Sequence, residues 1–190
     1  MPLLARKHRR KLWFLLGFAS GSGFLFIGLI GLRVLFPFEY RVDILQWSEA
    51  HDLAPEWVAS VIRNESRFRP QALSPVGAIG LMQIMPETGT WIAQQLQLTR
   101  YSTTLLNDVS LNIEMGTWYL RYLLDRFVTL DAALMAYNAG PANAERWKGN
   151  LELAFPGTQQ YVHRIHLSLP VYRFYFAVPW LINLIPSLYF

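Results

Sequence analysis

The sequence predicts an all-α protein in which a single helical domain follows an N-terminal transmembrane helix. Apolar residues recur at helical spacing in several segments after residue 39. No segment alternates in the manner of a strand with hairpin turns. Residues 12–32 form a run of 21 residues without a charged side chain, which is long enough to span a bilayer as a helix.

The N-terminal segment has the features of a membrane anchor. Five of the 17 basic residues lie within residues 6–11, directly before the apolar run, and positive charge marks the cytoplasmic side. We therefore expect a cytoplasmic tail at 1–11, an anchor at 12–36 and an exported domain. A cleaved signal peptide with the small-residue site ASGSG (19–23) is the alternative. The anchor is favoured because FLFIGLIGL continues the apolar run beyond that site.

Composition excludes several classes of protein. Without its basic tail, the chain has 12 Lys and Arg against 13 Asp and Glu, so no basic face for nucleic acid is expected. The absence of Cys excludes disulfides, a thiolate nucleophile and Cys-ligated zinc. His163 and His166 have no acidic residue close by in the sequence, which favours surface histidines. We expect no metal and no cofactor.

The helices of the domain follow from periodicity and end signals. They are expected at about 39–49, 55–66, 86–98, 109–127 and 131–139, followed by a last helix that contains Tyr161, Val162, Ile165 and Leu169. Pro55 suits a first helical position, and Gly140-Pro141 ends a helix. Asp108 or Ser110 can cap the longest helix. Residues 69–85 contain two Pro and two Gly, which predicts an ordered loop.

Glu65 is the residue that the pattern of the domain does not explain. Val58, Val61 and Ile62 make an apolar stripe, and the next position on that stripe is Glu65. Burial raises the pKa of a carboxyl group, and a Glu with a raised pKa can act as a general acid in glycoside cleavage. The alternatives are a Glu that binds buried backbone groups or one that turns outward.

Polar residues elsewhere could share a cleft with Glu65. Ser66 follows it directly, and Gln83 carries a donor and an acceptor for sugar hydroxyl or N-acetyl groups. Tyr137 and Asn138 stand at a helix end, where side chains can face a cleft. Their alternatives are half-buried packing for Tyr137 and capping for Asn138.

Five motifs in order resemble the family 1 lytic transglycosylases, the SLT domain related to goose-type lysozymes. They are ESRF, SPVGAIGLMQIMPET, NIEMGTWYL, AYNAGPANAERW and YVHRI, and they span about residues 43 to 167. The resemblance implies a lysozyme-like helical domain, here at 39–170, that cleaves the β-1,4 bond between N-acetylmuramic acid and N-acetylglucosamine in peptidoglycan. It implies that Glu65 is the catalytic acid/base. The cleft residues that it implies are Ser66, Met82, Gln83, Tyr137, Asn138 and Tyr161.

A partner carboxylate for Glu65 is hard to find in the sequence. Hydrolases of this kind use two carboxylates. Glu87 lies in a first helical turn, Asp108 is a cap, and Glu114 is expected to face solvent. One acid favours attack by the sugar's own C6 hydroxyl, which gives a 1,6-anhydro product. A distant acid such as Asp131 or Glu145, a hydrolytic lysozyme and a non-catalytic glycan-binding protein remain alternatives.

The C-terminal region departs from the family pattern. Gly157 and Gln159 replace the Glu and Arg of the usual Glu-Thr-Arg, which puts a peptide-stem contact in doubt. Pro170 is expected to interrupt the last helix. Residues 171–190 are expected to form an apolar tail, and 174–190 contain no charge. We expect this tail to contact the membrane interface; the alternative is packing on the domain.

Overall fold

The computed structural model describes residues 28–182, with side chains through residue 180. A short helix covers residues 28–35. The helices that follow are α2 (Arg41–Ala50), α3 (Pro55–Glu65), α4 (Pro86–Gln95), α5 (Val109–Phe127), α6 (Leu130–Ala139), α7 (Pro141–Arg146), α8 (Pro156–Ala177) and α9 (Pro179–Ile182). Two short 3₁₀ helices, η1 (Thr103–Asn107) and η2 (Leu151–Leu153), complete the set.

The predicted all-helical architecture is confirmed for the part of the chain that the structure describes. It contains no β-strand there, only isolated bridges that pair Leu73 with Ile79 and Ile79 with Ile84 in the loop before α4. Most of the expected anchor at 12–36 lies outside the described residues. Within residues 28–182, no helix has the length and apolar character needed to cross a membrane.

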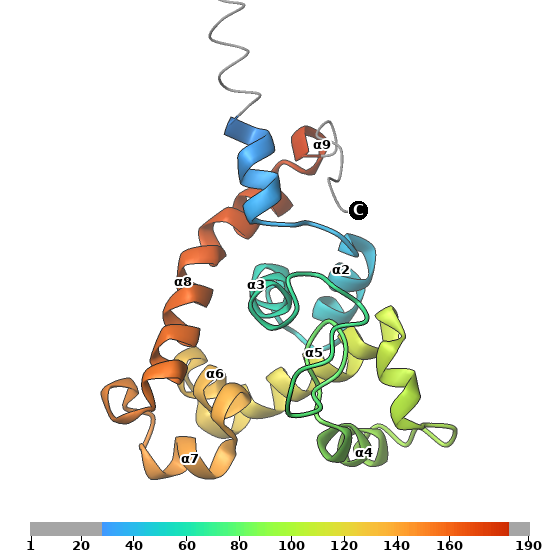
Figure 1. Cartoon of the computed structure of the whole chain (residues 1–190), viewed down its shortest axis with the longest axis vertical. Helices are drawn as coiled ribbons and strands as arrows, with labels where there is room; N and C mark the ends of the chain where they lie inside the picture. Colours follow the sequence, from blue (N-terminus) through green and yellow to red (C-terminus); the bar gives the residue numbers. More distant parts are fainter. Residues whose placement is uncertain (1–27, 183–190) are drawn as a thin grey trace, which may run out of the picture.

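Helix α3 lies in the middle of the domain. Figure 1 shows it end-on, with α2, α5, α6 and α8 arranged around it. The side chains of Val58, Ala59, Val61 and Ile62 are all 0% exposed, so α3 is buried on several faces rather than along one stripe. Its most extensive helix contact is with α8, which runs along one side of the domain. This arrangement brings the C-terminal end of α3 next to the first turns of α8.

The helix boundaries agree with the expected ones to within a few residues. The Asp108 carboxylate accepts a hydrogen bond from the Leu111 amide at 2.8 Å, so Asp108 is the N-cap of α5. Pro55 and Pro86 stand at the first positions of α3 and α4. The sequence analysis missed α7 and the two 3₁₀ helices, which are too short for a periodic pattern.

The predicted interruption at Pro170 is wrong. Helix α8 continues through it to Ala177. Tyr172 and Tyr175 are only 0% and 1% exposed, so packing of this last part of the helix outweighs the backbone hydrogen bond that a proline removes. The described beginning of the expected tail at 171–190 therefore belongs to the helical body. Residues 183–190 lie outside the described residues.

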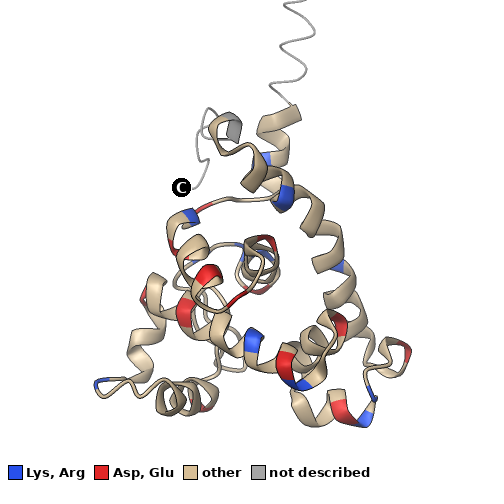
Figure 2. Ribbon diagram, turned by 180° about the vertical axis from the view of Figure 1, so that it is seen from behind, with Lys and Arg blue, Asp and Glu red and all other residues tan. Residues whose placement is uncertain are grey.

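Charged residues are distributed over the described helices. Figure 2 shows Lys and Arg interspersed with Asp and Glu rather than gathered over one helix. His166 of α8 pairs with Asp131 of α6 at 2.7 Å, which places this histidine at an exposed contact between two helices.

Candidate active site

Glu65 is the last residue of α3, and the chain turns sharply after it. The Ser66 hydroxyl donates a hydrogen bond to the Ile62 carbonyl at 3.2 Å, which ties the end of the helix back on itself. Arg67 and Phe68 have φ values of 54° and 63°, in the left-handed region that residues with side chains seldom adopt. Ser66 is 1% exposed, so its side chain supports the helix end, and its predicted role in substrate binding stays a prediction.

Tyr161 of α8 holds the Glu65 carboxyl group. The Tyr161 hydroxyl donates a hydrogen bond to Oε1 of Glu65 at 2.7 Å. Burial is the largest influence on the Glu65 carboxyl and raises its pKa to about 7, against smaller lowering effects of the Tyr161 hydrogen bond and the Arg164 charge. Half of such groups carry a proton at neutral pH, so Glu65 can give a proton and take one back.

A second tyrosine, close enough to Glu65 to be affected by its charge, fixes the loop before α4. The Tyr137 hydroxyl, at the end of α6, donates a hydrogen bond to the Met82 carbonyl at 2.8 Å. Burial is the first cause that holds the pKa of Tyr137 well above its usual value, and the nearby Glu65 charge adds to the rise. Tyr137 therefore remains a neutral donor and connects the loop to the neighbourhood of the acid.

The side chain of Asn112 on α5 also holds this loop through hydrogen bonds. The Asn112 Oδ1 accepts a hydrogen bond from the Met82 amide at 2.7 Å, and its Nδ2 donates to the carbonyls of Ile79 and Leu106 at 3.1 and 2.8 Å. Gly80 packs against the Asn112 side chain and has a φ of +83°. A Cβ at this position would lie 2.3 Å from the Asn112 side-chain nitrogen. This close approach requires the glycine.

The Met82 side chain is buried in the core. It is 0% exposed and packs over Gly116 of α5, where a Cβ would meet the Met82 sulfur at 2.4 Å. The role of Met82 in substrate binding that the resemblance implies stays a prediction, and the side chain itself packs in the core. Met82 also contributes its backbone carbonyl, which positions Tyr137.

Gln83 and Asn138 keep one polar group each for a ligand. The Gln83 Nε2 donates to the carbonyls of Ala72 and Gly80 at 3.1 and 2.9 Å, so the amide oxygen is the group that can face a sugar. Asn138 is exposed, and its Oδ1 accepts a hydrogen bond from the Thr158 hydroxyl at 2.9 Å. The orientation leaves the Asn138 amide nitrogen as a donor.

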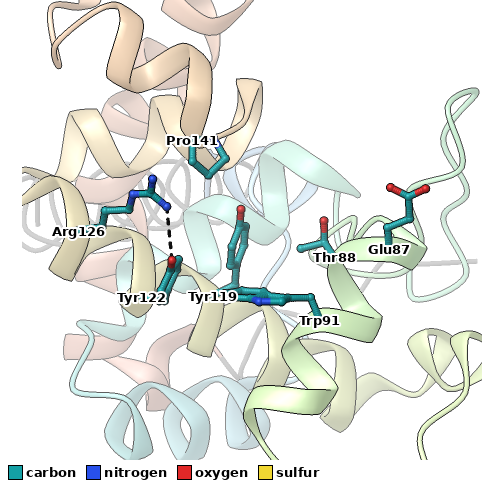
Figure 3. A pocket seen from close by; sticks show the side chains of 7 residues that line it. All are labelled: Glu87, Thr88, Trp91, Tyr119, Tyr122, Arg126 and Pro141. Atoms are coloured by element: carbon teal, nitrogen blue, oxygen red, sulfur yellow. Dashed lines mark hydrogen bonds between the residues drawn. The ribbon is translucent and has the colours of Figure 1, made fainter.

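An aromatic pocket of about 450 Å³ lies beside Tyr137. Figure 3 shows the side chains that line it, which are Glu87, Thr88, Trp91, Tyr119, Tyr122, Arg126 and Pro141. The ring centroids of Trp91 and Tyr122 are 5.0 Å apart, and those of Tyr119 and Tyr137 are 5.6 Å apart. Glu65 does not line the pocket, but Tyr137 connects the two.

The sequence analysis missed this pocket. No binding role was predicted for Trp91, Tyr119 or Tyr122. The available signal was the spacing of Tyr119 and Tyr122, which are three residues apart on α5 and so share a face. Nothing in the sequence indicated that Trp91 of α4 lies against them.

The other carboxylates considered in the sequence differ in their exposure. Glu114 was expected to face solvent, but it is partly buried on α5, and burial raises its pKa. Glu87 is exposed at the rim of the aromatic pocket. Among the described residues, the only charged side chain that acts on the Glu65 pKa is Arg164.

A comparison with protein families identifies the domain. The family model described as the transglycosylase SLT domain matches residues 43–153, which is more than half of the chain. The chain belongs to the transglycosylase SLT domain family. The matched residues of this SLT domain include Glu65, the loop that carries Gln83, and Tyr137, whereas Tyr161 lies beyond the match.

Known relatives of this SLT domain carry related names. The soluble lytic murein transglycosylase of Escherichia coli K12 is 32% identical over 157 residues, which cover 76% of this chain and 24% of the relative. Membrane-bound lytic murein transglycosylase C of Actinobacillus pleuropneumoniae is 29% identical over 112 residues, which cover 54% of this chain and 31% of the relative. The chain thus spans about a quarter to a third of the length of these relatives.

A solved structure confirms the fold class. The crystal structure of the 70 kDa soluble lytic transglycosylase of Escherichia coli superimposes with a TM-score of 0.72 at 32% sequence identity. The superposition covers 76% of this chain and 26% of that one. The SLT domain therefore has the helical fold that its motifs imply.

Proposed function

We propose that this protein is a peptidoglycan lytic transglycosylase. It cleaves the β-1,4 bond between N-acetylmuramic acid and N-acetylglucosamine, and it leaves a 1,6-anhydromuramic end. The observation that carries this proposal is the Glu65 carboxyl group, with its pKa raised to about 7 by burial and its Oε1 bound by Tyr161. Membership of the SLT domain family and the names of its relatives support the substrate class.

One carboxyl group can carry out both proton transfers of this reaction. Protonated Glu65 gives its proton to the glycosidic oxygen, and the bond between that oxygen and C1 of the muramic residue breaks. The Glu65 carboxylate then takes the proton of the C6 hydroxyl of the same sugar, whose oxygen closes on C1. Glu65 ends protonated again, and no water is consumed. A pKa near the working pH suits a group that must act first as acid and then as base.

The surroundings of Glu65 favour this route over hydrolysis. A hydrolase places a second carboxyl group about 5 to 9.5 Å from the acid, as nucleophile or as base. Among the described residues, the charged side chain that acts on the Glu65 pKa is the basic Arg164, which lowers it, and no acidic residue is among the causes of its shift. Glu87, at the rim of the aromatic pocket, is the carboxylate to be tested.

The pocket and the polar groups next to Glu65 fit a glycan strand. Trp91, Tyr119 and Tyr122 present aromatic rings in an open pocket, and aromatic faces suit the apolar faces of pyranose rings. The Gln83 amide oxygen and the Asn138 amide nitrogen supply an acceptor and a donor for N-acetyl groups. We therefore assign binding roles to Gln83, Asn138 and the aromatic pocket, with Tyr137 and Tyr161 as positioning residues.

We further propose that the domain is anchored in the cell membrane on the cell-wall side. The basic residues within 6–11 and the uncharged run at 12–32 support a single-pass anchor at 12–36 with a cytoplasmic tail at 1–11. A relative with the name membrane-bound is compatible with this location. The catalytic domain begins at about residue 39 and, because α8 is continuous, extends to Ala177 rather than to 170.

The decisive experiment analyses the products of purified peptidoglycan. Glu65→Gln keeps the shape and the acceptor for Tyr161 but removes the proton, so cleavage should cease. Glu49→Gln, at an exposed position of α2 outside the pocket, is the matched control and should keep near wild-type activity, and Glu87→Gln should still give 1,6-anhydro ends. Mass spectrometry should find 1,6-anhydro ends, which are lighter than reducing ends by one water molecule. Reducing ends would instead establish hydrolysis, and reducing ends that disappear in Glu87→Gln would identify Glu87 as the second carboxylate of a hydrolase.

A further inference from the structure

One end of the molecule carries exposed apolar side chains from three elements. Residues 28–35, the C-terminal end of α8 and α9 lie together there, at the top of Figure 1. Val34, Leu35, Phe174 and Trp180 are 55%, 63%, 42% and 67% exposed, and we call these four residues the collar. We propose that the collar docks on the interface of the lipid bilayer and holds the catalytic cleft at a fixed height above the membrane.

The chain on both sides of the collar indicates a bilayer as its occupant. Residues 28–35 of the described chain lie at this end, and the sequence before them is uncharged from residue 12 on; the sequence NLIPSLYF (183–190) after α9 is also without charge. Trp, Phe and Leu are the side chains that amphipathic elements insert at the level of the lipid headgroups. A docking surface for a soluble protein would not need uncharged segments on both sides.

The charged residues of this end make ion pairs within the domain, and Arg173 remains 69% exposed while it does so. Arg33, between the collar and the core, is 7% exposed and pairs with Glu39 at 3.2 Å. Arg173 is the residue before Phe174, and its guanidinium pairs with Glu56 of α3 at 3.2 Å. This end thus presents exposed apolar side chains beside one exposed arginine, a combination that suits the headgroup level of a bilayer.

The collar is joined to the domain by close packing rather than by a flexible linker. The Tyr172 hydroxyl of α8 donates a hydrogen bond to the Pro37 carbonyl at 2.9 Å. The Phe38 ring lies 5.2 Å from that of Tyr175 and 4.9 Å from that of Phe176, measured between centroids. These contacts fix the segment after residue 35 against the C-terminal end of α8.

The same helix sets the height of the active site. Tyr161 and Phe174 both belong to α8 and are separated by thirteen residues, which correspond to about 20 Å along the helix axis. Because Tyr161 binds Glu65, the acid is held at about this distance from the collar. This inference rests on the proposed function. The substrates are then the glycan strands that pass within about 20 Å of the membrane surface.

Site-directed spin labels can test the docking in the full chain. The protein has no Cys, so Leu35→Cys, Phe174→Cys and Trp180→Cys each give one labelling site, and Val128→Cys is the control at an 81% exposed apolar residue. In nanodiscs of phosphatidylethanolamine and phosphatidylglycerol, labels on the collar should collide several-fold more with oxygen, relative to a water-soluble nickel complex, than the control label. Equal ratios at all four sites would overturn the proposal, as would a chain that does not enter nanodiscs.

Energy transfer can test the fixed height. A donor dye at Leu73→Cys, on the loop before α4, should transfer energy to acceptors on the lipid headgroups. The same labelled chain with Phe174→Gln and Trp180→Gln added should show less energy transfer. The chains with and without these two substitutions should cleave soluble glycan strands at equal rates. Unchanged transfer would contradict the collar. Loss of cleavage by the parent chain would contradict the proposed function instead, so the two failures are distinguishable.

Discussion

Glu65→Gln should stabilise the folded protein at alkaline pH and leave its stability at acidic pH nearly unchanged. The folded domain raises the pKa of Glu65 from 4.5 to about 7. Between these values the folded chain keeps a proton that the unfolded chain has released. The stability of the wild type therefore falls as pH rises through this window, and it stays low above pH 7.

The size of the effect follows from the difference between the two pKa values. At 1.36 kcal/mol for each pH unit, the rise from 4.5 to about 7 corresponds to about 3 kcal/mol. Glu65 is only half-buried by surface area, so water screens part of this cost. We therefore expect ionised Glu65 to lower the free energy of unfolding by about 2 kcal/mol. Gln at this position has no charge to desolvate, and its oxygen can still accept the hydrogen bond of Tyr161.

The assay is chemical unfolding of the full chain in one detergent, at about pH 8 and about pH 4, on either side of the window. Glu65→Gln should exceed the wild type by about 2 kcal/mol at the higher pH and by almost nothing at the lower one. Glu87→Gln, at an exposed position, should show no such dependence. The reasoning fails if Glu65→Gln differs from the wild type by the same amount at both pH values.

Three further perturbations follow from single contacts. Tyr161→Phe removes a hydrogen bond that lowers the Glu65 pKa, so the alkaline limit of cleavage should move up by about 1 pH unit, and a pH profile of the initial rate would measure this. Gly116→Ala places a Cβ against the Met82 sulfur and should lower the free energy of unfolding by about 1 to 3 kcal/mol, measured by denaturant titration. N-terminal sequencing of the mature protein should give a start before residue 12, and a start between residues 19 and 26 would establish a signal peptide instead.

Much of the helical fold could be predicted from the sequence because its signals are local. The apolar stripe of α3, the proline at its start and the Asp108 cap depend on residues within one or two turns. Glu65 was found by the same logic, since a carboxylate on an apolar stripe contradicts the pattern around it. The break expected at Pro170 was also a local inference, and it was wrong because burial of Tyr172 and Tyr175 decides the conformation there.

The tertiary structure decided which side chains reach a ligand. Met82 and Gln83 are adjacent in the sequence, yet the Met82 side chain is buried against Gly116. The Gln83 side chain binds the loop through its nitrogen and leaves its amide oxygen as an acceptor for a ligand. Tyr161 lies 96 residues from Glu65, so their hydrogen bond follows only from the packing of α8 on α3. Periodicity gives the faces of each helix but not which faces meet, because the pairing of helices depends on contacts between residues far apart in the chain.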